Sequence, residues 1–534
     1  MSEYLARWKK LFFGLLAADS VSARLQTISL CLILLMCLGI RIAHIDAPRL
    51  DRTAWKEIDY IEITSNYMRN GFDFVKPEIS WPAEPPRTTA MELPLVPYAS
   101  ALVCAIAGFH AFSFRLITLL SFLVISVYTY RLARLELGPL VALIAAFAAS
   151  VLPLSHYYGN MVFSEPAMIA FSVMAIFHFR QWSHSGSKRE WVLSALFFAL
   201  AVALKLEPLY LLLPLAYIAY GRYGRNWQSY RFFAAFVICS LSIAVVWFSY
   251  AYHIARTSLD VYGIFGGLEG GHDKFQTLGM LSDPEWYQIM VHRIAGMGGK
   301  TGLLLFVAGA AATVLLRINS VFFFYLLAVG VYFMIVAEGN IDGPYRQMVI
   351  VPPFSVFAAL GALAVGVTVC ATLGHMRKEG YSSGYRIGSM LIACVLVAMI
   401  VADKRDAIFS RDPLLPAAPD QWVMAKELRK HAREGDKIIT LGAYTIHKGG
   451  NDLSPVFYYY AGLQGWSLQK GQWNLETAKA LMNKGARYLV AHEMIREPES
   501  APFMEEVRKI SRVLYEDEER RSVILELDGQ SRSR

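Results

Sequence analysis

Twelve apolar runs fill most of residues 1–402, and they constrain the fold of this chain more than any other feature. Residues 1–402 carry only 30 Lys and Arg and 23 Asp and Glu, whereas residues 403–534 carry 21 and 20 in a third of that length. Apolar runs long enough to cross about 30 Å of hydrocarbon indicate membrane-spanning helices. We therefore predict two domains, an α-helical multispanning membrane domain at 1–402 and a soluble domain at 403–534.

This division excludes a cytosolic enzyme, a fibrous protein and a disordered chain. It also weighs against a nucleic-acid partner, because the net charge of +8 falls almost entirely in the membrane part. Basic residues there are typical topology signals rather than a phosphate-binding face.

The number of spans depends on the run at 93–109. It has 17 residues, with Pro94 and Pro97 in its first turns, which is short for a crossing helix. If this run lies on the outer surface, every basic cluster, such as Arg131 and Arg134, falls on the cytoplasmic side. We therefore predict eleven spans plus a juxtamembrane helix, a cytoplasmic N-terminus and an external C-terminal domain.

The first external loop contains a short amphipathic helix within residues 52–74. Glu57 and Asp59 are expected before the helix body, and Gly71 is expected to end the helix. Acids at this position also stabilise a helix N-terminus, so helix capping remains an alternative role for both.

Several short motifs recur in a fixed order along the first two thirds of the chain. They are Glu57 and Asp59 before Tyr60, then Gly71, Glu92-Leu93-Pro94-Leu95, Arg115-Leu116 and Ser164-Glu165-Pro166. This order resembles the GT-C superfamily of integral-membrane glycosyltransferases, in particular protein O-mannosyltransferases and lipid A aminoarabinose transferases. The resemblance covers roughly residues 25–370. One departure is that Lys56 stands where the family has the first acid of its pair, so either Asp59 or Glu57 takes that role.

The resemblance implies transfer of a sugar from a polyprenyl-phosphate donor to an acceptor hydroxyl on the outer face of the membrane. Such a reaction needs a carboxylate to take the acceptor proton and cations to neutralise the leaving phosphate. The implied catalytic residues are Asp59, Glu57 and Glu165. The implied substrate-binding residues are Glu92, Arg115, Lys205, Tyr345 and Arg346. For the acids the alternatives are capping and interfacial ion pairs, and for the bases the alternative is snorkelling to the membrane surface.

The resemblance further implies a polyprenyl-phosphate lipid, a glycan, lipid or protein acceptor and the bilayer as partners, in a bacterial inner (cytoplasmic) membrane with the C-terminal domain periplasmic. No cofactor is certain. The external loop 255–299 is expected to form a lid, and its His272 and Asp273 are a possible divalent metal site, although a solvated loop is the simpler interpretation.

The C-terminal domain alternates helical and strand patterns. Helices are expected near 419–433, 474–484 and 501–510, and strands at 437–441, 487–491, 513–516 and 522–527. This order predicts a soluble α/β domain with a partly parallel sheet. It lacks a Gly-rich phosphate loop, so we expect it to bind the acceptor or support the membrane domain.

Two other classes of protein remain alternatives to an enzyme. A transporter or flippase of lipid-linked glycan has ionisable residues near mid-membrane and often repeated halves, but the spans here are almost free of charge. A non-catalytic assembly subunit with a lost active site is the second alternative, and the departure at Lys56 keeps it open.

Overall fold

The computed structural model shows two compact units, which are described separately. The described residues are 2–17, 21–43, 45–46, 54–80, 84–258, 277–376, 383–403, 420–441, 444–445, 450–451, 456–468, 470–492, 498, 500–519 and 521–528. The helical unit comprises residues 1–45, 115–248 and 272–410. The mixed unit comprises residues 46–114, 249–271 and 411–534.

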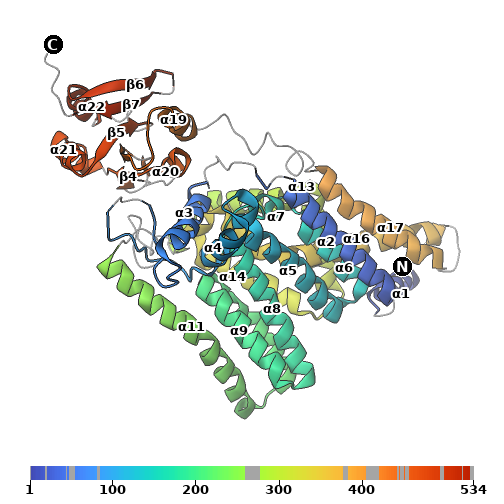
Figure 1. Cartoon of the computed structure of the whole chain (residues 1–534). Coiled ribbons are helices and arrows are strands. Elements are labelled where there is room, and N and C mark those ends of the chain that lie inside the picture. Colours follow the sequence, from blue (N-terminus) through green and yellow to red (C-terminus); the bar gives the residue numbers. More distant parts are fainter. Residues whose placement is uncertain are drawn as a thin grey trace. The chain divides into compact units, whose positions relative to one another are not determined.

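Helices make up the helical unit (Figure 1). In chain order they are α1 (Ser2–Leu16), α2 (Ala23–Ile42), α5 (Ala111–Leu137), α6 (Pro139–Val151), α7 (Pro153–Tyr158), α8 (Ser164–Ser185), α9 (Lys188–Leu204), η1 (Glu207–Leu211), α10 (Leu212–Tyr223), η2 (Trp227–Ser229), α11 (Tyr230–Thr257), α12 (Thr277–Leu281), α13 (Pro284–Leu315), α14 (Val321–Ile335), α15 (Ala337–Asp342), η4 (Pro344–Ile350), α16 (Val351–Met376) and α17 (Ser383–Asp403).

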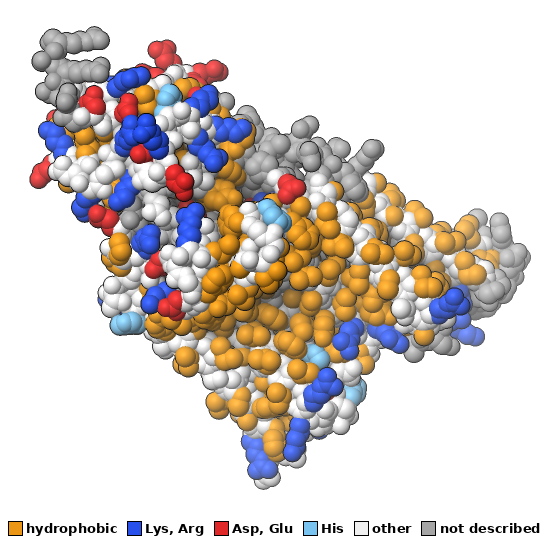
Figure 2. Space-filling model, viewed as in Figure 1, with side chains coloured by type: hydrophobic (Ala, Val, Ile, Leu, Met, Phe, Trp, Pro, Cys, Tyr) orange, Lys and Arg blue, Asp and Glu red, His pale blue; other side chains and the backbone are white. Residues whose placement is uncertain are grey.

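Among the described residues, six helical stretches are long and apolar enough to cross a membrane. They are Ala23–Ile42, Ala111–Leu137, Trp227–Thr257, Pro284–Leu315, Pro344–Gly374 and Gly384–Asp403. Hydrophobic side chains dominate the visible face of the helical unit in Figure 2. The remaining predicted runs form shorter or more polar helices, so the count of eleven spans stays a prediction.

The run at 93–109 forms α4 (Leu95–Ala107), a helix of 13 residues. At 1.5 Å per residue it is about 20 Å long, which is short of the roughly 30 Å of a bilayer core. This length fits the predicted juxtamembrane helix.

Two glycines allow a close approach of α13 and α16 in the helical unit. A side-chain carbon at Gly309 of α13 would overlap the carbonyl oxygen of Phe357 in α16, and one at Gly361 would overlap the carbonyl oxygen of Leu305. The two backbones therefore touch directly, as small residues allow in membrane helix pairs.

Two interruptions of the helices carry polar residues. Helix α9 ends at Leu204, and Lys205 has an extended backbone before η1 begins at Glu207. Similarly, α15 and η4 separate α14 from α16, with Pro344 at the start of η4. Irregular backbone of this kind is tolerated in membrane proteins where it is buried in protein or lines a cavity.

The mixed unit joins the first predicted external loop to the C-terminal region. The loop forms α3 (Ala54–Asn70) and α4. The C-terminal region contains α19 (Asp420–Leu428), β1 (Lys437–Thr440), β2 (Tyr444–Thr445), β3 (Gly450–Asn451), α20 (Val456–Ala461), β4 (Gln464–Ser467), η6 (Lys470–Gln472), α21 (Leu475–Asn483), β5 (Ala486–Ala491), α22 (Ser500–Arg508), β6 (Ser511–Asp517) and β7 (Ser522–Leu527).

The main sheet has the strand order β4-β1-β5-β7-β6. Strand β1 pairs in parallel with β4 and β5, whereas β7 pairs antiparallel with β5 and β6. The predicted α/β fold with a partly parallel sheet is confirmed. Charged side chains are frequent on the visible face of this region, in agreement with its high charge content (Figure 2).

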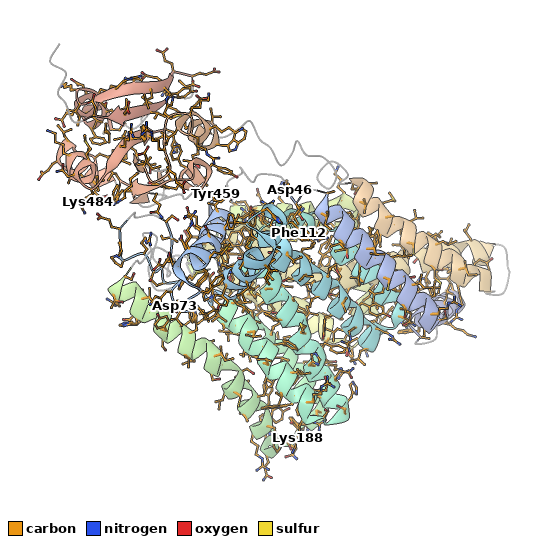
Figure 3. The ribbon with its side chains drawn as sticks, in the orientation of Figure 1. Asp46, Asp73, Phe112, Lys188, Tyr459 and Lys484 are labelled. Carbon is orange, nitrogen blue, oxygen red and sulfur yellow. The ribbon has the colours of Figure 1, made fainter. Side chains whose placement is uncertain are left out.

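Contacts between α3 and α20 connect the loop to the C-terminal region. Ile58 and Val456 are both buried in one apolar cluster, against which Tyr459 and Tyr460 pack. At the surface, Lys484 Nζ lies 2.8 Å from Glu84 Oε2. Figure 3 labels Tyr459 and Lys484 on the C-terminal side of these contacts.

The predicted division at residue 402 follows the composition of the chain and stays a prediction. Packing groups the residues differently, because residues 46–114 share their contacts with residues 411–534. The structure therefore makes the first loop a part of the C-terminal unit.

Candidate active site

Four charged side chains form a continuous chain of contacts in the helical unit. Lys205 Nζ lies 3.1 Å from Glu165 Oε1 and 3.8 Å from Glu207 Oε1. Arg346 Nη1 lies 3.1 Å from the same Glu207 oxygen. These residues come from the first turn of α8, the break after α9, the start of η1 and η4. The two helix interruptions thus bring Glu165, Lys205 and Arg346 together, three residues that the sequence singled out separately.

All four side chains are largely hidden from solvent, between 2% and 12% exposed. Removing ions from water costs several kcal/mol each unless opposite charges and hydrogen bonds compensate for it. Ionisable groups kept at such cost within a membrane domain commonly bind a ligand or move protons. Their burial therefore makes a merely snorkelling role for Lys205 and Arg346 a poor explanation.

Tyr345 lies beside both cations. Its ring centroid is 5.9 Å from Lys205 Nζ and 5.6 Å from the Arg346 guanidinium carbon. The rings of Tyr158 and Phe163 pack edge-on against it, with centroids 6.2 Å and 5.6 Å away. This aromatic wall excludes water from one side of the cations, which strengthens their interaction with an anion.

Two buried donors next to this cluster make no hydrogen bond of good geometry among the described residues, although Tyr332 and Arg346 lie close enough to interact. They are Nε of Arg346 and the hydroxyl of Tyr332. The Tyr332 hydroxyl interacts electrostatically with Glu207, Arg346 and Lys205. Buried donors are normally satisfied, so donors without a well-aligned acceptor beside two cations suit a ligand that is rich in acceptor oxygens.

Arg41, near the end of α2, holds the break between α6 and α7 in place. Its side chain is fully buried, and its guanidinium donates to the carbonyl oxygens of Ser150 and Ser155 at 3.1 and 3.2 Å. These carbonyls flank the break before Pro153, where α6 ends and α7 begins. Because α7 carries Tyr158, Arg41 helps to fix the aromatic wall.

The loop acids lie in the mixed unit. Glu57 and Asp59 are 1% and 3% exposed and fall within the first turns of α3, which begins at Ala54 rather than after them. The expected end of the helix is confirmed, since α3 stops at Asn70 and Gly71 has a φ of 95°.

A third carboxyl on the same helix, Glu62, was not singled out by the sequence. It is 5% exposed and accepts a hydrogen bond from the backbone N–H of Ser80 at 3.4 Å. Burial raises the pKa of Glu62 to about 8, although the Ser80 N–H and the charge of Arg69 oppose the shift. Glu62 also interacts electrostatically with Tyr458 on α20. The Tyr458 hydroxyl forms a hydrogen bond of 2.7 Å with the Thr440 hydroxyl.

The other predicted binding residues have different surroundings. Glu92 precedes α4 in the mixed unit and is partly buried. Arg115 is buried in α5 and donates to the carbonyl oxygen of Ile45. In the predicted lid, His272 and Asp273 lie outside the described residues.

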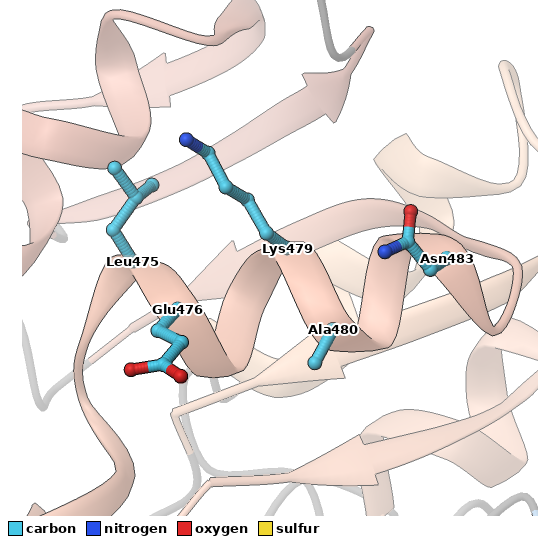
Figure 4. A pocket seen from close by; sticks show the side chains of 5 residues that line it. All are labelled: Leu475, Glu476, Lys479, Ala480 and Asn483. Atoms are coloured by element: carbon cyan, nitrogen blue, oxygen red, sulfur yellow. The ribbon is translucent and has the colours of Figure 1, made fainter.

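Neither a group of metal ligands nor the hollow beside α21 provides a second candidate site in the part of the chain that the structure describes. Within the ranges that the structure describes, no three His, Cys, Asp or Glu side chains are grouped to hold a metal ion. A hollow beside α21 is lined by residues of that one helix, and Glu476 and Lys479 leave it in different directions (Figure 4). Such a surface does not provide converging catalytic groups.

Comparisons with known proteins identify the fold. Residues 86–250 match the family described as dolichyl-phosphate-mannose-protein mannosyltransferase. The structure is similar to ArnT from Cupriavidus metallidurans bound to undecaprenyl phosphate, with a TM-score of 0.60, 13% identity and coverage of 93% of this chain and 97% of that one. The chain has a GT-C glycosyltransferase fold. The predicted GT-C resemblance is therefore confirmed, and with its apolar helices the chain is an integral membrane protein.

A second GT-C structure is also similar. The oligosaccharyltransferase of Archaeoglobus fulgidus in the apo form aligns with a TM-score of 0.52 and 13% identity, over 92% of this chain and 73% of that one. A search of curated proteins finds no match.

Sequence reasoning missed Glu207 and Glu62 as candidate site residues. For Glu207 a signal was available, because it stands two residues from Lys205 and directly before Pro208, at a predicted helix end. For Glu62 none was, since it interacts with the Ser80 N–H and with Tyr458, which stands almost 400 residues further along the chain.

Proposed function

We propose that this protein transfers a sugar from a polyprenyl-phosphate donor to an acceptor hydroxyl at the outer face of a bacterial inner membrane. The observation that carries the proposal is the buried pair of cations, Lys205 and Arg346, which lie beside the ring of Tyr345. The fold supports it, because ArnT shares this fold and was solved with undecaprenyl phosphate.

In the proposed reaction Lys205 and Arg346 bind the phosphate of the donor. Negative charge grows on this phosphate as the sugar leaves, and preorganised cations in a water-poor site stabilise such charge strongly. Glu165 holds Lys205 in place through the 3.1 Å contact between their charged atoms. Tyr345 shields the cations from solvent.

The acceptor hydroxyl is a weak nucleophile and needs a base to take its proton. We propose that Asp59 or Glu57 of the first external loop is this base, as the GT-C resemblance implies. Glu92 and Arg115 remain proposed binding residues for the substrates. The acceptor is proposed to be a glycan, a lipid or a protein that reaches the site from the periplasm.

Binding of undecaprenyl phosphate to the purified full chain in detergent tests the phosphate site. We expect Lys205→Gln and Arg346→Gln each to weaken binding by about tenfold or more, the scale of one lost charge-assisted hydrogen bond. Arg225→Gln is the matched control, since Arg225 is an exposed arginine of the same unit. Unchanged affinity in both site variants would rule out the proposed phosphate site.

Transfer assays in membranes test the base. With a panel of radiolabelled polyprenyl-phosphate sugars, wild-type membranes should transfer label from at least one donor, and Asp59→Asn or Glu57→Gln should reduce transfer by at least about a hundredfold. Full activity in both variants would exclude these acids as the base.

A further inference from the structure

Glu207 is unusual among the four charged residues because one of its oxygens serves both cations. Its Oε1 lies 3.1 Å from Arg346 Nη1 and 3.8 Å from Lys205 Nζ. The carboxylate therefore occupies the space between the two groups that are proposed to hold the donor phosphate. Its side chain is 11% exposed, compared with 2% for Glu165, so Glu207 is the more accessible acid of the two.

The charge of the lipid phosphate changes during the proposed reaction. The donor is a phosphodiester with a single negative charge. When the acceptor oxygen bonds to the anomeric carbon, the bond between that carbon and the phosphate oxygen breaks, and its electron pair remains on the phosphate. The acceptor proton passes to the base. The product is then a phosphate monoester, which carries about −1.5 to −2 charges at pH 7.

A site made only of cations would hold this product more tightly than the donor. Each added negative charge strengthens the attraction to Lys205 and Arg346, and the low dielectric of a buried site enlarges the difference. A carboxylate that competes for the same two cations has the opposite effect, because it repels the more highly charged monoester more than the diester.

We infer that Glu207 is a specificity-determining residue that makes the phosphate site favour the singly charged diester donor over the monoester product. This inference rests on the proposed function. Its ligand class is the polyprenyl phosphodiester, and its consequence for the reaction is faster release of the spent lipid.

Two lipids that differ by one negative charge and one methyl group test the inference directly. Affinities of the purified full chain for undecaprenyl phosphate and for its methyl phosphodiester are compared at pH 8, where the monoester is fully ionised. We expect Glu207→Gln to shift the affinity ratio toward the monoester by about tenfold, the effect of removing one like charge at contact distance. Glu207→Asp keeps the charge and should retain the wild-type ratio.

Glu190→Gln is the matched control, because it removes a carboxylate that bonds His178 at 2.6 Å, a contact separate from the four-residue chain. An unchanged ratio in Glu207→Gln would overturn the inference. If Lys205→Gln and Arg346→Gln still weaken both lipids in that case, the proposed phosphate site stands and only the role of Glu207 is wrong. If neither lipid binds the wild-type chain, the proposed function fails and this inference fails with it.

Discussion

Replacing Glu62 by glutamine is expected to remove the loss of stability that ionisation of this buried carboxyl causes in the unit containing α3 and α20 as the pH rises. The buried Glu62 carboxyl has a pKa of about 8, compared with an ordinary value of 4.5. Each pKa unit corresponds to about 1.4 kcal/mol, so charging this group inside the folded unit costs on the order of 5 kcal/mol.

The sign follows from where the proton is held. Between pH 4.5 and about 8 the folded unit keeps the proton of Glu62, whereas the opened unit releases it. Stability from this group is therefore complete below pH 4.5, falls by about 1.4 kcal/mol per pH unit as the pH rises, and reaches its minimum above pH 8. Glutamine has the shape of the protonated acid and does not titrate.

Hydrogen exchange of the α3 and α20 peptides in the full chain measures this local stability. Between pH 6 and 8 the wild-type opening free energy should fall by about 2–3 kcal/mol after correction for intrinsic exchange rates. Glu62→Gln should show no such fall. Glu505→Gln is the control, because Glu505 is 76% exposed in α22 of the same unit. Equal slopes in the wild type and Glu62→Gln would refute the reasoning.

Three further changes test the packing. Gly309→Ala should lower the thermal stability of the detergent-purified protein by about 3 kcal/mol, because the new methyl group overlaps the backbone of α16, whereas Gly330→Ala, which meets open space, should be neutral in the same melt. Arg41→Met should cost about 3 kcal/mol by leaving the Ser150 and Ser155 carbonyls without their buried donor, and a melting curve equal to that of Arg24→Met would contradict this. Lys484→Ser should change the exchange of α3 by less than about 1 kcal/mol, since its ion pair with Glu84 is half exposed, and a larger change would show that this surface contact holds the unit together.

Local patterns were enough to predict most elements of the fold. The helix end at Gly71 and strand β7 at 522–527 follow from signals within a few residues, namely a glycine, which tolerates the positive φ found there, and a short apolar run. The order of short motifs was also sufficient for the GT-C resemblance. These features are encoded close to where they appear, so a single sequence reveals them.

Contacts between distant segments were beyond the reach of these patterns. The sequence marked Glu165, Lys205, Tyr345 and Arg346 one at a time, and the folded helices were needed to show that they touch. No helix was predicted at 456–461, yet this run forms helix α20 and packs on α3. A helix that is buried against a segment far along the chain shows no local sequence periodicity that would predict this contact.

The packing of Ile58 against Val456 sets an order of events during synthesis. At about 10 residues per second, roughly 40 s pass between the emergence of α3 and that of the helix that covers it. For that time the apolar side of α3, the helix that carries the proposed base, is not yet covered by the C-terminal region. A chain that stops before residue 456 therefore leaves Ile58 of α3 without this apolar cover.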